Sequence, residues 1–205
     1  MKVLNSKVLC LAAGLIGLVI AGAGMASAQD VFKVNYFDNN GFTLASGLVA
    51  PDAKVRIDNP GLTYGNLCAM MYVFAADQQL AECCGCIETH NGLRKLSVRN
   101  DLTSNPLTGR VPLMGVIKVI SALPINGVCN PSTNVTPKPN LRVWVTHIQD
   151  FSVPGTSGEI VFPTTETESS DSALGATELA NLQAQCSFIN ILGSGAGICT
   201  CGIGD

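Results

Sequence analysis

Alternating hydrophobic and polar residues mark much of the chain. In AKVRIDNPG, Val55 and Ile57 alternate with charged residues until an Asn-Pro-Gly break ends the pattern. A period of two is typical of a β-strand with one buried face. Further strands are predicted in VFKVNYF, FTLASGLVA, LRKLSVRNDL, PLMGVIKVISAL, LRVWVTHIQ and the end of VPGTSGEIVFP. Asn40-Gly41 predicts a hairpin turn between the first two of these.

Two segments have other patterns. NLCAMMYVF, residues 66–74, is a short uninterrupted apolar run between turn residues, which favours a buried strand in the middle of a sheet. Residues 173–192 form the one clear helical pattern, followed by Gly193 as a stop signal. Its shared apolar face consists of Leu179, Leu182, Cys186 and Ile189. Cys186 is therefore expected to face the body of the protein.

Together these elements predict a mainly β fold. We expect an antiparallel, sandwich-like domain with one C-terminal α-helix, stapled by disulfides. Residues 29–205 are long enough for a single domain with a real core, in which residues 193–205 form a cysteine-containing tail.

The first 28 residues have the pattern of a secretory signal peptide. Lys2 and Lys7 precede an apolar run, and Ala-Ser-Ala at 26–28 is a small-residue cleavage site. The alternative is an uncleaved anchor, because residues 8–28 approach the ~20 residues that span a bilayer. The cleavage pattern favours the signal peptide. It predicts a secreted or periplasmic protein with no membrane span after cleavage.

Charge gives no indication of a nucleic-acid partner. Without Lys2 and Lys7, 10 basic residues face 15 acidic ones, and the formal charge moves from -3 to -5. The chain has no basic run, and its few aromatic residues are not interleaved with Lys or Arg. The sequence predicts no nucleic-acid binding.

Eight cysteines follow the predicted signal peptide: Cys68, Cys83, Cys84, Cys86, Cys129, Cys186, Cys199 and Cys201. An even number in an exported protein predicts four disulfides, and the sequence leaves 105 connectivities open. Adjacent Cys83 and Cys84 are not expected to bridge each other, nor are Cys199 and Cys201, because the rings would be strained.

The cluster AECCGC, residues 81–86, suggests how some bridges run. In an extended strand, Cys84 and Cys86 share one face and Cys83 lies on the other. A hairpin that turns near residues 77–78 would bring Cys68 opposite Cys86. Bridges from the cluster to the C-terminal cysteines would hold the glycine-rich tail on the sheet.

A metal site is the alternative for the same cluster. Its ligands would be the thiolates of Cys83, Cys84, Cys86, Cys199 and Cys201, which suit copper(I), zinc or an iron–sulfur cluster. Structural zinc sites usually have two C-x-x-C pairs, whereas this chain has only one, Cys83 and Cys86. Export to an oxidising space also favours disulfides. The sequence therefore favours bridges and predicts no cofactor.

Other chemistry is sparse. His90 is expected in an exposed turn and His147 in a strand, and no G-x-S-x-G elbow or H-E-x-x-H helix accompanies them. A polar acidic loop before the helix, with Glu166, Glu168 and Asp171, could bind calcium through its carboxylates, although a solvated loop at a helix start explains them equally well. We predict no catalytic or cofactor-binding residue.

Several motifs, taken as a set, resemble exported bacterial proteins without an assigned activity. These motifs are VRIDNPG, LCAMMYVFAADQQLAECCGC, LSVRNDLTSNPLTGRVP, LRVWVTHIQ and ELANLQAQCSFI with GSGAGICTCG. That set shares a cysteine-rich core, a strand-rich body and a C-terminal C-x-C. The resemblance spans most of residues 55–202 and implies a single exported module, with no functional residue to carry over.

The sequence as a whole predicts a secreted, non-enzymatic structural, adhesive or surface-assembly protein. Strand edges are the expected route to self-association or to a cell-surface partner. The alternative function is a secreted metal-binding protein that uses the clustered cysteines.

Overall fold

The structure is a computed structural model that describes residues 30–39, 52–62, 65–103, 111–149, 153–158 and 160–192, together with Cys199 and Cys201. The predicted signal peptide, the predicted Asn40-Gly41 turn and the strand FTLASGLVA lie outside the described residues.

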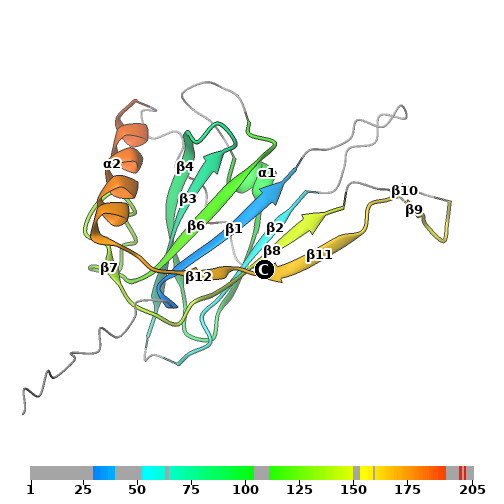
Figure 1. The fold of residues 1–205 in the computed structure, drawn as a ribbon. Coiled ribbons are helices and arrows are strands. Elements are labelled where there is room, and N and C mark those ends of the chain that lie inside the picture. Colours follow the sequence, from blue (N-terminus) through cyan, green and yellow to red (C-terminus); the bar gives the residue numbers. More distant parts are fainter. Residues whose placement is uncertain are drawn as a thin grey trace, which may run out of the picture.

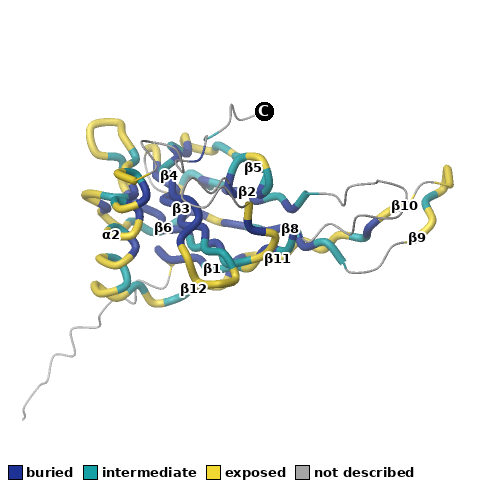
Figure 2. The backbone as a smooth tube through the Cα atoms, turned by 90° about the horizontal axis from the view of Figure 1, so that it is seen from above, coloured by how far each residue is buried: buried dark blue, intermediate teal, exposed yellow. Residues whose placement is uncertain are grey.

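Two antiparallel sheets form the body of the protein (Figure 1). The six-stranded sheet consists of β12 (Ser170–Ser172), β1 (Phe32–Asp38), β6 (Met114–Leu123), β3 (Leu67–Ala75) and β4 (Leu80–Glu88) in this order, with β7 (Thr136–Pro137) paired to β6. The four-stranded sheet runs β11 (Thr164–Glu168), β8 (Arg142–Ile148), β2 (Lys54–Asp58) and β5 (Leu93–Ser97). A separate pair, β9 (Val153–Pro154) and β10 (Ile160–Val161), extends away from both sheets (Figures 1 and 2).

The six-stranded sheet is the middle of three layers. One face packs on the four-stranded sheet in an apolar core that includes Val55, Ile57, Met71, Ile117 and Val119. The other face packs on helix α2 (Ala176–Leu192) through a second core that includes Met70, Tyr72, Ile120, Leu182 and Ile189. Since both faces of β3 are covered, nearly all its residues are buried (Figure 2). The prediction of a mainly β sandwich with a central apolar strand and a C-terminal helix is confirmed.

Helix α2 begins at Ala176, three residues later than predicted, and buries three of the four predicted positions: Leu182, Cys186 and Ile189. Leu179 is partly buried against the same core. An ion pair of 2.6 Å between Lys118 on β6 and Glu178 also joins the helix to the sheet. The opposite side of the helix leaves Phe188, Ile191 and Leu192 exposed.

The polar stretch before the helix is not the loop that the sequence predicts. It forms β11 at the edge of one sheet and β12 at the edge of the other, and the chain changes sheets at the buried Ser169. The backbone N–H of Ser169 donates to Val143 O at 2.8 Å. All five residues of β11 are exposed, so the strand has no hydrophobic alternation that a sequence pattern could reveal. The crossing closes one side of the sandwich.

The predicted strand LRKLSVRNDL ends at Ser97 and continues as a single helical turn, α1 (Val98–Asp101). The Ser97 hydroxyl accepts from the Asn100 backbone N–H at 2.9 Å, and the Asp101 carboxylate accepts from the Ser97 N–H at 2.7 Å. This reciprocal capping satisfies backbone donors at the start of the turn and explains why the strand stops there.

Among the described residues, no helix combines the length and apolar character needed to cross a membrane.

Candidate functional site: the cysteine ladder on β4

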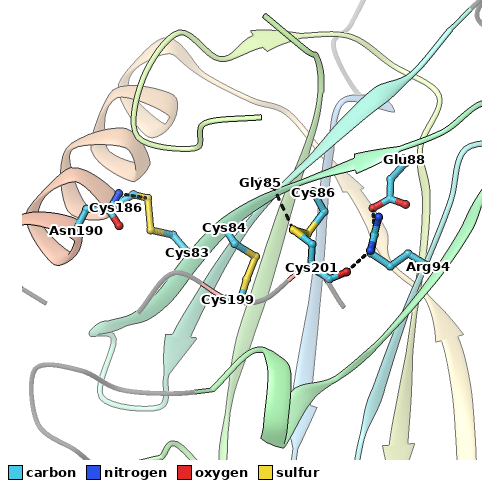
Figure 3. The surroundings of a disulfide bond; sticks show 10 residues. All are labelled: Cys83, Cys84, Gly85, Cys86, Glu88, Arg94, Cys186, Asn190, Cys199 and Cys201. Atoms are coloured by element: carbon cyan, nitrogen blue, oxygen red, sulfur yellow. Dashed lines mark hydrogen bonds and ion pairs between the residues drawn. A yellow bond between two sulfur atoms is a disulfide. The ribbon is translucent and has the colours of Figure 1, made fainter. Parts of the chain in front are cut away.

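Four disulfides join the eight described cysteines in pairs, and Figure 3 shows the three that involve Cys83, Cys84 and Cys86. The Cα–Cα distances are 5.5 Å for Cys68–Cys129, 5.8 Å for Cys83–Cys186, 5.2 Å for Cys84–Cys199 and 5.4 Å for Cys86–Cys201. All four fall in the range that an unstrained backbone allows for a disulfide. Three of the bridges start from β4, and we name these three the cysteine ladder.

The cysteine ladder leaves β4 in two directions, because neighbouring side chains of a strand point to opposite faces. Cys83 lies in the core under helix α2, where it meets Cys186. Cys84 and Cys86 lie in the core between the two sheets, where they meet Cys199 and Cys201. The predicted split of the cluster between two faces is observed in Figure 3.

The predicted pairing of Cys68 with Cys86 is wrong, and a β-bulge is the reason. Near the turn, Phe74 pairs with Leu80, and this register would carry Cys68 opposite Cys86. The register then shifts so that Val73 pairs with Glu82, leaving Ala81 as an extra residue. Cys68 therefore lies opposite Ile87 and bonds Cys129 instead.

Gly85 lets the Cys129 loop approach β4. A Cβ at position 85 would lie 2.3 Å from the carbonyl oxygen of Cys129, much closer than any side chain tolerates. The glycine between the cysteines of the cluster is therefore required by packing, and it allows the Cys68–Cys129 bridge and the cysteine ladder to lie side by side.

The segment that holds Cys199 and Cys201 runs in the same direction as the part of β4 that holds Cys84 and Cys86, because both bridges span the same sequence separation of 115 residues. Their sulfur atoms enter the gap between β4, at the edge of one sheet, and β5, at the edge of the other. Arg94 on β5 donates a hydrogen bond to Cys201 O and another to Ile87 O on β4, the latter at 2.8 Å. These contacts close the side of the sandwich that lies opposite the β11–β12 crossing.

Arg94 also neutralises a buried carboxylate in this gap. Its Nε lies 2.6 Å from Glu88 Oε1, and the Glu88 side chain is 2% exposed. Burial raises the pKa of Glu88, although the neighbouring guanidinium opposes that shift. Neither residue was predicted from sequence, because only the hairpin register and the sheet packing bring them to the cysteine ladder.

The five cysteines that the sequence offers as possible metal ligands do not all lie together. Cys83 lies on the far face of β4, whereas the Sγ atoms of Cys84, Cys86 and Cys201 all lie within 4.8 Å of one another. In the part of the chain that the structure describes, no other three His, Cys, Asp or Glu side chains are gathered this closely. Cys199 belongs to the same group through its bond to Cys84. The candidate metal ligands that lie together are therefore the sulfur atoms of four cysteines rather than five.

Neither histidine belongs to this group of sulfur atoms. His90 is exposed in the turn after β4, as predicted. His147 is buried on β8, where its Nε2 lies 2.6 Å from Thr167 Oγ1 and its ring stacks on Tyr36 with centroids 4.0 Å apart. Burial lowers the pKa of His147. Its contacts position β8, β11 and β1 relative to one another.

The three carboxylates of the calcium interpretation do not gather. Glu166 and Glu168 lie on β11, whereas Asp171 lies on β12 in the other sheet. Glu166 lies 2.5 Å from Arg56 Nη1, and Asp171 forms an ion pair with Lys33. Both therefore serve as partners of cations across strands.

Comparison with known proteins gives no relative: no family model, curated protein or solved structure matches the chain. Fold and chemistry are therefore the basis for the functional argument.

Proposed function

We propose that the protein is an exported, non-enzymatic structural component that acts in adhesion or surface assembly. The observation that carries this proposal is the cysteine ladder, which joins one strand to one C-terminal segment by three bridges. Stable disulfides belong to oxidising compartments, and the signal-peptide pattern of residues 1–28 supports the same location outside the cytoplasm. Such reinforcement suits a protein that must keep its shape without chaperones or turnover.

The edge strand β11 has backbone groups that a second chain could pair with. Gln149 donates its N–H to Pro163 O at 2.9 Å, which makes residues 163 and 149 a hydrogen-bonded pair. Because such pairs alternate along an antiparallel ladder, the backbone groups of Thr164, Glu166 and Glu168 face away from β8. These outward groups are available to a strand from a second chain.

Two further features favour association over catalysis. The outer surface of helix α2 exposes Phe188, Ile191 and Leu192, which adds apolar area outside both cores. Only 13% of the residues are charged, so little electrostatic repulsion separates copies of the chain. Both features suit an assembly component.

The test compares two variants at one position of β11. Glu166→Pro removes the outward N–H, whereas the matched control Glu166→Ala removes the same exposed ion pair and keeps the N–H. Sedimentation velocity of the oxidised protein over a series of concentrations should show association for the unmodified chain and Glu166→Ala, and less association for Glu166→Pro. Monomers at every concentration, together with no retention on the producing cells, would contradict the proposal.

A further inference from the structure

Two C-x-C segments face each other in the gap between β4 and β5. The geometry points to a second state of this group, in which Cys84, Cys86, Cys199 and Cys201 hold one zinc ion after their two disulfides are reduced. This inference goes beyond the proposed structural role, and it concerns a state that replaces two bridges by one metal cross-link.

The positions of the sulfur atoms suit tetrahedral coordination. With zinc–sulfur bonds of about 2.3 Å, the four sulfurs of a zinc site lie about 3.8 Å apart. The Sγ atoms of Cys84, Cys86 and Cys201 already lie within 4.8 Å of one another, and Cys199 is bonded to Cys84. Only small side-chain rotations separate the two arrangements, because all four sulfurs stay in the same gap.

The surroundings suit a charged metal site with an entry path. Cys84 and Cys86 are buried, which excludes water from one side, whereas Cys201 is half-buried and open to entering ions. A zinc ion with four thiolates carries a net charge of about -2. The guanidinium of Arg94 hydrogen-bonds Cys201 O and also pairs with the Glu88 carboxylate, so its positive charge offsets only part of that negative charge.

The chemistry balances with a dithiol as the reductant. Each bridge accepts two electrons and two protons from one dithiol, which leaves as its own disulfide. Two such steps break both sulfur–sulfur bonds and yield four thiols. Binding of Zn²⁺ then displaces the four thiol protons to solvent and forms four zinc–sulfur bonds, with no change in the oxidation state of the metal.

The other two bridges provide matched controls within the same chain. Cys83 and Cys186 meet under helix α2, on the opposite face of β4. Cys68 and Cys129 also lie on that face. Among the described residues, neither of their sulfur atoms belongs to a close group of three or more possible metal ligands. Their removal should leave the zinc site intact.

The experiment measures metal binding to the mature chain after treatment with a dithiol under nitrogen. Cobalt(II) serves as a spectroscopic probe for the tetrahedral thiolate site, and zinc stoichiometry is measured by native mass spectrometry. We expect one equivalent of metal in the reduced chain, none in the oxidised chain, and none in reduced Cys84→Ser/Cys86→Ser. The reduced control Cys68→Ser/Cys129→Ser should still bind one equivalent.

Three outcomes would overturn the inference. They are no metal binding by the reduced chain, unchanged binding in Cys84→Ser/Cys86→Ser, or equal loss in the Cys68→Ser/Cys129→Ser control. If reduction unfolds the chain, zinc should restore its β-sheet circular dichroism, since metal binding and folding are coupled, and failure to restore it also counts against the site. Association of the oxidised protein is a separate measurement, so either proposal can fail alone.

Discussion

The bridges of the cysteine ladder share their loops, so their contributions to stability should be unequal. Formed alone, Cys83–Cys186 closes a sequence separation of 103 residues, which restricts the unfolded chain by about 4.7 kcal/mol in the chain-entropy description. Once it exists, Cys84–Cys199 closes a path of only about 15 residues, worth about 3 kcal/mol. Cys86–Cys201 then closes a path of about six residues, worth about 2 kcal/mol.

Cys68–Cys129 is the matched comparison. Its separation is 61 residues, and no path through the other bridges is shorter, so its expected contribution is about 4 kcal/mol. Cys68–Cys129 and Cys86–Cys201 each join one fully buried cysteine to one half-buried cysteine. We therefore predict that Cys86→Ala/Cys201→Ala lowers the free energy of unfolding by about half as much as Cys68→Ala/Cys129→Ala.

Urea unfolding followed by circular dichroism, with the remaining bridges oxidised, measures both values. Equal losses in the two variants, or a loss near 5 kcal/mol for the Cys86 pair, would refute the shared-loop reasoning. Such a result would mean that each bridge acts on the unfolded chain as if the others were absent.

Two further predictions concern single side chains. Gly85→Ala places a Cβ against the Cys129 carbonyl and should lower the free energy of unfolding in urea by about 1–3 kcal/mol. The control Gly175→Ala, whose Cβ meets nothing within 4 Å, should not lower it. Equal effects of the two substitutions would contradict the packing argument. Because burial lowers the pKa of His147, its contribution to stability should be fully present above about pH 6.5 and should fall as the pH drops toward the folded-state pKa. Between pH 7.5 and 5, the urea midpoint should therefore fall less in His147→Gln than in the unmodified chain or in the exposed-site control His90→Gln. If the midpoint of His147→Gln falls with pH as steeply as that of the unmodified chain, the prediction is contradicted.

Local patterns were sufficient for the parts of the fold with one buried face. Val55 and Ile57 alternate with charged residues, and both pack between the sheets as predicted. The same period of two placed Cys83 and Cys84 on opposite faces of β4. Spacings of three and four residues placed Cys186 on the buried side of α2. In each case one face contacts a core, and burial therefore leaves a periodic signal in the sequence.

Non-local contacts determined the remaining parts. The bulge at Ala81 changes the partner of Cys68, and no residue type near it specifies where the register shifts. The edge strand β11 is exposed at every position, so only its threonines, which favour strands, distinguish it from a loop. Arg94 reaches the cysteine ladder because β5 and β4 become neighbouring edges of two packed sheets.

The direction of the cysteine ladder also bears on how the chain matures. Cys83, Cys84 and Cys86 are synthesised about a hundred residues before their partners Cys186, Cys199 and Cys201. A nascent chain that already contains Cys68 and Cys129 can form that bridge, yet it must keep three closely spaced thiols from reacting with one another or with the wrong partner. A chain cut before Cys186 would lack the partners of all three thiols. Cys86 therefore gains its partner only after synthesis has passed Cys201, and the last bridge of the ladder can form only in a chain of nearly full length.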